Sequence, residues 1–230
     1  MKAYDLYLDS GPMKKKTYVH VPRLLGCIAR GDTSDEAVER SPDAIRTFLA
    51  FAARAGERVD PNAVFRVRVA EHVTDNQWPG NGGGFIPTDA APLTPRESDA
   101  LMQRLAAIHA GLRRLTSGLT AKQLDAAPRK GRPIRRILQH VCVEGAYLRG
   151  IPGSSRLISD VEKGGLDAHD ALDQLFELEH ERLRAMSKEE RAEVIMRGQT
   201  PWSARAAVRR MLEHGWEHYL EIAERLKATP

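Results

Sequence analysis

Hydrophobic positions in the second half of the chain repeat at spacings of three and four, a pattern that predicts amphipathic helices. The clearest stretch covers residues 204–226. One face of this helix carries Met211, Gly215, His218 and Ile222, with His214 beside it. Histidines four residues apart stand one turn apart, here on the face expected to be buried. A buried imidazole needs polar partners, and a metal ion would serve both side chains.

Three further helices are expected between residues 94 and 199. Thr94, Pro95 and Glu97 supply a capping residue, a proline in the first turn and an acid, followed by apolar residues at helical spacing to residue 119. Two more apolar stripes cover about residues 134–148 and 172–186, and Thr200-Pro201 marks the start of the last helix. The pattern predicts an all-α four-helix bundle over residues 94–230.

The first part of the chain has the patterns of a small α+β domain. Tyr4, Leu6 and Leu8 alternate with other residues, which predicts a strand, and a second strand is expected at residues 17–21. Valines and arginines at residues 64–69 predict a later strand. An α+β domain over residues 1–75 follows from this order.

A helix separates these strands. Thr33 and Glu36 form a capping box, and apolar residues from position 37 to 52 provide a core face. Pro42 falls inside this helix. Either the helix kinks there, or it ends and restarts with Ser41 as a new cap.

Glycine and proline are concentrated between Trp78 and Pro92. A phosphate-binding loop would end in Gly-Lys-Ser/Thr, which this segment lacks. We therefore interpret residues 76–93 as a mobile linker and place the domain boundary at about residue 93.

Composition narrows the class of protein. The 230 residues are 42% hydrophobic, enough for a core, and the net charge of +4 does not by itself indicate nucleic-acid binding. Cys27 and Cys142 cannot form a disulfide framework, which favours a reducing compartment. No signal peptide or apolar run of about 18 residues is found, so we expect a cytoplasmic protein that does not span a membrane.

The histidines divide into candidate ligands and others. We expect His109 and His180 at surface or rim positions and His169 at the entry to a polar loop. His20 and His72 have no His, Cys or acidic residue at ligand spacing. His140 follows Ile137 by almost one turn, and Glu144 lies one turn further on the same face. Together with the pair in residues 204–226, this arrangement predicts a metal site in the bundle core, with ligands His140, His214 and His218.

Residues 21–37 carry a first family resemblance. They include Val-Pro-Arg-Leu-Leu-Gly-Cys at 21–27 and Arg-Gly-Asp-Thr-Ser-Asp-Glu-Ala at 30–37. Residues 1–75 thereby resemble the HicB-like domain of HicA–HicB-type antitoxins. The resemblance implies a β-β-β-α-β domain similar to a partial RNase H fold, and a toxin protein or nucleic acid as partner. Pro42 departs from the uninterrupted helix of that family.

A second resemblance covers residues 95–228. Ile-Leu-Gln-His-Val-Cys-Val-Glu at 137–144 and Leu-Glu-His-Gly-Trp-Glu-His-Tyr-Leu-Glu-Ile at 212–222 resemble the DinB/YfiT-like metal-binding four-helix bundles. The resemblance implies a divalent ion, zinc or nickel, with iron or manganese as alternatives, and a homodimer. The implied ligands are again His140, His214 and His218.

Three histidines leave one coordination position open, which is typical of catalytic sites. The DinB-like superfamily includes S-transferases that use low-molecular-weight thiols, and a maleylpyruvate isomerase. We therefore expect a metal-dependent hydrolase or a low-molecular-weight-thiol S-transferase acting on a small molecule. Glu144 is the candidate orienting group or general base, and its alternative is an ordinary surface carboxylate. Cys142 is expected to be a packing residue.

A basic cluster surrounds the start of the second bundle helix. It consists of Arg129, Lys130, Arg132, Arg135 and Arg136. Arg136 precedes His140 by one turn, so we expect Arg136, with Arg132, to anchor an anionic group of the substrate or thiol. The alternative is a solvated basic loop paired with acids elsewhere.

Two other classes of function fit the same residues. In one, the protein is a regulator whose HicB-like domain binds a protein or RNA and whose bundle senses a ligand. In the other, the metal only stabilises the bundle. An open cleft at the metal indicates an enzyme, whereas a fourth protein ligand indicates a structural site.

Overall fold

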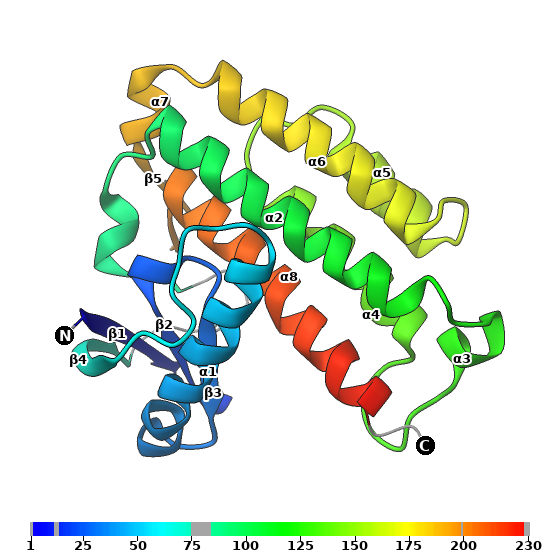
Figure 1. The fold of residues 1–230 in the computed structure, drawn as a ribbon. Coiled ribbons are helices and arrows are strands. Elements are labelled where there is room, and N and C mark those ends of the chain that lie inside the picture. Colours follow the sequence, from blue (N-terminus) through cyan, green and yellow to red (C-terminus); the bar gives the residue numbers. More distant parts are fainter. Residues whose placement is uncertain (1, 12–13, 75–83, 199, 228–230) are drawn as a thin grey trace. The chain divides into compact units, whose positions relative to one another are not determined.

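The computed structural model describes residues 2–11, 14–74, 84–198 and 200–227, shown in Figure 1. The N-terminal region forms a small sheet and the rest is mostly helical, as predicted. Contacts divide the chain into two compact units. The first contains Met1–Leu93 and Glu190–Glu213, and the second contains Thr94–Glu189 and His214–Pro230. One division therefore falls at residue 93, but residues 190–213 belong with the N-terminal sheet.

The first unit is built on a four-stranded sheet. Its strands are β1 (Lys2–Gly11), β2 (Lys14–His20), β3 (Ile28–Gly31) and β4 (Phe65–Val73), in the order β3-β2-β1-β4. A short 3-10 turn, η1 (Pro22–Leu24), separates β2 from β3. β1 is antiparallel to β2 and parallel to β4, and the parallel pair requires the crossover that helix α1 (Ser34–Arg54) supplies. The element order is the predicted β-β-β-α-β.

Helix α1 continues through Pro42, so of the two alternatives a stop and restart at Ser41 is excluded. Proline has no N–H to donate to the carbonyl of Val38, four residues earlier. The hydroxyl of Ser41 donates to that carbonyl at 2.7 Å and replaces the missing bond. At the N-terminus, the Glu36 N–H donates to the Thr33 hydroxyl, which confirms the predicted cap.

The segment returning to the first unit differs from its prediction. It contains the short helix α7 (Lys188–Ala192), the antiparallel strands β5 (Val194–Arg197) and β6 (Thr200–Ser203), and the start of α8 (Ala204–Lys227). The first residues of α7 belong to the second unit. Thr200 and Pro201 therefore lie in a strand, and the prediction that they begin the last helix was wrong. Ser203 is the actual cap, because its hydroxyl accepts from the Ala206 N–H at 3.0 Å.

Part of the predicted linker is packed inside the first unit. Residues 76–83 lie outside the described residues. Beyond them, Ile86, Asp89 and Leu93 are fully buried, and η2 (Pro87–Ala90) turns Asp89 inward. A solvated linker would not bury these side chains.

Asp89 is buried because it pairs with Arg209 of α8. The Arg209 Nε donates to Asp89 Oδ1 at 2.9 Å and Nη2 donates to Oδ2 at 2.8 Å. Its Nη1 donates to Glu213 Oε2, also at 2.8 Å. Burial by itself raises the pKa of Glu213, but the charges of Arg209 and His20 outweigh it and hold the pKa at about 2.

His20 completes this buried network. Its Nδ1 lies 2.8 Å from Glu213 Oε1, and its Nε2 lies 3.7 Å from Asp9 Oδ2. Burial lowers the pKa of His20 and the charge of Glu213 raises it, with a net increase above the usual value. The sheet, the turn before residue 93 and the first half of α8 are thus joined through paired charges.

The second unit is helical. Its elements are α2 (Pro95–Thr116), α3 (Ala121–Asp125), α4 (Ile134–Val141), η3 (Cys142–Ala146), α5 (Ser154–Glu162), α6 (Ala168–Ala185) and the second half of α8. Thr94 and Glu97 form the predicted capping box of α2. The predicted helix at 134–148 is shorter, because α4 ends at Val141 and the chain tightens into η3.

Within this unit α2 and α6 run side by side (Figure 1). A four-helix bundle remains a prediction, since α3, η3 and α5 add turns that the periodicity did not indicate. Among the described residues, no helix is both long and apolar enough to cross a membrane.

Replacing Arg209 should strongly destabilise the protein. Arg209→Leu leaves Asp89 and Glu213 buried without their cation, which costs roughly 3–5 kcal/mol. Arg205→Leu is the matched control on the same helix, because Arg205 donates to the carbonyls of Ala91 and Pro92 and is half-buried. The free energy of unfolding of this control, measured in urea, should be lower than that of the wild type by about 1 kcal/mol. Equal losses for the two variants would contradict the role of the charge network.

Candidate metal centre

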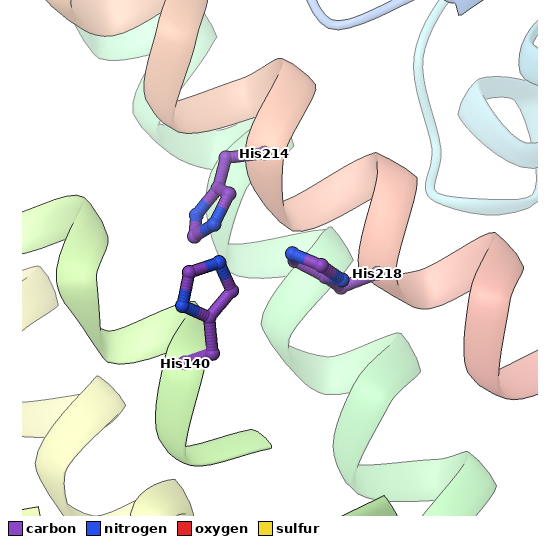
Figure 2. Close-up of side chains that lie close together, drawn as sticks. All are labelled: His140, His214 and His218. Carbon is purple, nitrogen blue, oxygen red and sulfur yellow. The ribbon is translucent and has the colours of Figure 1, made fainter. Parts of the chain in front are cut away.

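The three predicted histidines converge in the second unit. His140 lies near the end of α4, and His214 and His218 lie one turn apart on α8. Each offers one ring nitrogen, and these atoms all lie within 4.8 Å of one another. Figure 2 shows the three rings turned toward a common point. The ring centroids are 4.8 to 5.1 Å apart.

Gly215 lets α8 approach its neighbours closely at this point. A Cβ atom on Gly215 would lie 3.1 Å from Cγ2 of Ile108 on α2, closer than most real contacts. The same turn buries Met211, Leu212 and Trp216. The two histidines are therefore held on a tightly packed part of α8, where their backbone positions are well defined.

A carboxylate orients His218. Its Nδ1 lies 2.8 Å from Glu221 Oε2, which leaves Nε2 available to a metal ion. Glu221 also accepts from Arg225 Nη2 at 3.1 Å, and its hydrogen bond with His218 lowers the pKa of Glu221. Metal-binding histidines commonly use such a partner to fix ring orientation. Glu221 was not predicted, although a carboxylate three residues after His218 on a helix lies within reach of the histidine ring.

Access differs among the three rings. His214 and His218 are buried, whereas His140 is half-buried. The ring of Tyr147 meets His214 edge to face, with centroids 5.6 Å apart. An ion would therefore be enclosed mainly from the α8 side.

The donor set fits a zinc-like ion. Neutral imidazoles suit zinc and nickel, with bonds of about 2.0–2.1 Å to zinc. Ligand nitrogens on tetrahedral zinc lie about 3.4 Å apart by that geometry. The three ring nitrogens lie within 4.8 Å of one another, which is near but wider than that spacing at its upper limit.

Glu144 lies in η3 and is completely buried, unlike an ordinary surface carboxylate. Its Oε1 is 2.7 Å from Nε2 of His109, an ion-pair distance without the geometry of a linear hydrogen bond. Its Oε2 lies 3.9 Å from the position of a Cβ on Gly215, so the carboxylate adjoins the histidine-bearing turn.

His109 was expected at the surface or rim and that prediction was wrong, because the residue is only 7% exposed. It follows Leu105 by one helical turn, so its place on the apolar stripe was readable from the sequence. A third buried group, Glu179 of α6, interacts electrostatically with Glu144. Burial first, and then the charge of Glu144, raise the pKa of Glu179 well above its usual value.

The two predicted anchoring arginines lie in different surroundings. Arg136 is exposed, and its Nη1 donates to Gln139 Oε1 at 3.0 Å. Arg132 is half-buried, its carbonyl accepts from Arg225, and its charge contributes to the lowered pKa of Glu221. Arg132 therefore interacts electrostatically with Glu221, the carboxylate that contacts His218 of the candidate metal centre. Elsewhere in the cluster, Arg135 pairs with Asp125 at 2.6 Å.

Cys142 lies outside the group of ligands, as predicted. Burial raises the pKa of its thiol, and its Sγ contacts the carbonyls of Leu138 and Ala168 at 3.6 and 3.5 Å. A thiol held protonated in this way packs as a small apolar side chain.

No family model, curated protein or solved structure matches this chain. The resemblances to HicB-like and DinB-like proteins therefore remain predictions that rest on the quoted motifs.

Glu179→Gln should make the protein more stable at neutral and alkaline pH. The pKa of Glu179 is higher in the folded state than in the unfolded state, so between these two pKa values the folded protein binds more protons. The free energy of unfolding of the wild type therefore falls as pH rises through this range. That slope is at most about 1.4 kcal/mol per pH unit. Unfolding at pH 5 and pH 8 should show that the advantage of the variant grows with pH.

The control for this measurement is Glu177→Gln, an exposed position on the same helix. It should change stability by less than about 0.5 kcal/mol at both pH values. A pH-independent loss in Glu179→Gln would show that the carboxyl is ionised in the folded protein.

Proposed function

We propose that this protein is a metal-dependent enzyme, a hydrolase or low-molecular-weight-thiol S-transferase, with its ion held by His140, His214 and His218. The observation that carries the proposal is the convergence of three imidazoles from α4 and α8. The Glu221 carboxylate behind His218 adds to it, because an orienting partner of this kind is common at metal sites.

The number of ligands favours catalysis over a structural role. Within the part of the chain that is described, the three histidines are the one group of His, Cys, Asp or Glu residues close enough to share an ion. A structural zinc site uses four protein ligands, whereas three leave a position for water or substrate. The absence of a fourth protein ligand in this group supports an open site.

A bound ion would supply Lewis acidity, and would favour the deprotonated form of a water or thiol in the open position. The protein's own contribution is positional. Glu221 orients His218, and Arg132 places positive charge beside Glu221. We infer that Arg132, rather than the exposed Arg136, attracts an anionic group of the substrate. Glu144 acts as a positioning residue beside the α8 turn.

Metal titration tests the ligand set. Full-length protein stripped with a chelator should bind one Zn²⁺ or Ni²⁺ in calorimetry. His140→Gln, His214→Gln and His218→Gln should each weaken binding by 100-fold or more, about 2.7 kcal/mol. Glu221→Gln should weaken it by about 10- to 100-fold. His72→Gln is the control, because His72 is exposed and bonded to Ser10 in the first unit.

The open position is tested separately with cobalt-loaded protein. Adding a small thiol should produce thiolate-to-cobalt absorption, since a free position accepts the sulfur. An unchanged spectrum would indicate a sealed structural site. Tight metal binding that survives all three histidine substitutions would overturn the proposed ligands.

A further inference from the structure

A second polar site lies in the helical unit, away from the three histidines. Residues of α2 and α6 line a cavity of about 410 Å³, a size typical of small-molecule sites. Ala106, Ala110, Leu172 and Phe176 give it apolar walls. None of the three candidate metal ligands is part of its lining.

His109, a largely buried residue, places part of its ring at this cavity. Its Nε2 lies 2.7 Å from Oε1 of Glu144, which does not line the cavity, so the opposite edge of the ring, with Nδ1, is the part left for a ligand. No hydrogen bond to Nδ1 occurs among the described residues, although the residue is more than nine-tenths buried. The ring of Phe176 meets it edge to face, with centroids 6.3 Å apart. A ligand group that donates a hydrogen bond to Nδ1 would satisfy this nitrogen.

Two arginines are also part of the cavity lining. Arg113 is fixed by Asp173 at 2.6 Å and by the carbonyl of His169 at 3.2 Å. Arg114 also lines the cavity and has no ion pair within the described part of the chain. Burial, followed by the charge of Arg113, lowers the pKa of His169, which disfavours a positive charge on this histidine. The charges of Arg113 and Asp173 offset each other, so Arg114 gives these lining residues a single net positive charge.

The backbone positions of these residues along α2 indicate the length of a ligand that would contact both His109 and the arginines. His109 and Arg113 are one helical turn apart, about 6 Å along the axis, and Arg114 is about 1.5 Å further. Six to eight ångströms is about the distance between para substituents across a benzene ring. Apolar walls lie between the two polar ends, which favours an organic anion over inorganic phosphate.

We propose that this cavity binds a small organic monocarboxylate that carries a hydroxyl group at its far end. The carboxylate pairs with Arg114, assisted by Arg113. The hydroxyl donates to Nδ1 of His109, which Glu144 holds in place from behind. The body of the ligand packs against Ala106, Leu172 and Phe176. None of the three histidines of the candidate metal centre lines this cavity, although Glu144 adjoins both His109 and the α8 turn.

The probe for this proposal is 4-hydroxybenzoate, titrated into full-length ¹⁵N-labelled protein. Amide shifts should saturate with a Kd below about 1 mM and should be confined to α2 residues 106–117 and α6 residues 169–176. Arg114→Gln should weaken binding about tenfold, because a charge-assisted bond is lost. Arg96→Gln, an exposed position on the same helix that does not line the cavity, should leave it unchanged.

Two related probes separate the polar ends. Neutral 4-hydroxybenzamide should bind at least tenfold more weakly to wild type, and Arg114→Gln should not weaken it further. Benzoate, which lacks the hydroxyl, should bind wild type and His109→Gln equally, whereas 4-hydroxybenzoate should lose about fivefold in that variant. Unchanged benzoate binding also shows that His109→Gln is folded.

Three outcomes would overturn the proposal. One is the absence of saturable shifts up to 10 mM probe. Another is equal binding to wild type and Arg114→Gln. The third is a set of shifts centred on residues 140, 214 and 218, which would mean that the carboxylate binds at the metal centre instead.

Discussion

The buried guanidinium of Arg209 is the constraint on which the first unit depends. An isolated charge in a protein interior is too costly to keep, so Arg209 requires anions around it. Asp89 and Glu213 supply two, and Asp9 adds a third beside His20. The raised pKa of His20 follows, because its protonation offsets an excess of negative charge. Residues from β1, β2, η2 and α8 thereby share one electrostatic network, which explains why residues 190–213 belong with the sheet.

Local patterns predicted strands β1, β2 and β4 and the starts of helices α1 and α2, but not the short elements between the long helices. The grouping of the elements into units depended on distant partners. The alternation at Tyr4, Leu6 and Leu8 and the capping signals at Thr33 and Thr94 act within a few residues, and the structure shows each of them. Asp89 lies in a stretch rich in glycine and proline, which by composition indicated a linker. Its partner is 120 residues away, and no local signal reveals such a pairing.

The candidate site shows the same division. The HxxxH spacing and the position of His140 were sufficient to predict that three imidazoles lie close together, as the structure shows. Helical periodicity fixes which side chains share a face. Glu221 was within reach of the same reasoning and was overlooked. The contact of Glu144 with His109 was not predictable, because it depends on how η3 and α2 pack. The proximity of Glu144 to Glu179 of α6 was also not predictable from the sequence.

The helical unit buries more ionisable groups than its stability requires. Glu144 and Glu179 have no exposed surface, and His109 and His214 have almost none. Apolar residues of similar volume are often neutral or stabilising in place of buried ionic groups, so folding alone does not account for these side chains. Concentrations of such groups are typical of functional sites. They form two sets with different chemistry. The imidazoles of α4 and α8 are suited to a cation, whereas Glu144, with Glu179 nearby, contacts His109 at a cavity that Arg113 and Arg114 also line. The electrostatic difference between the sets is the physical reason to treat them as two sites.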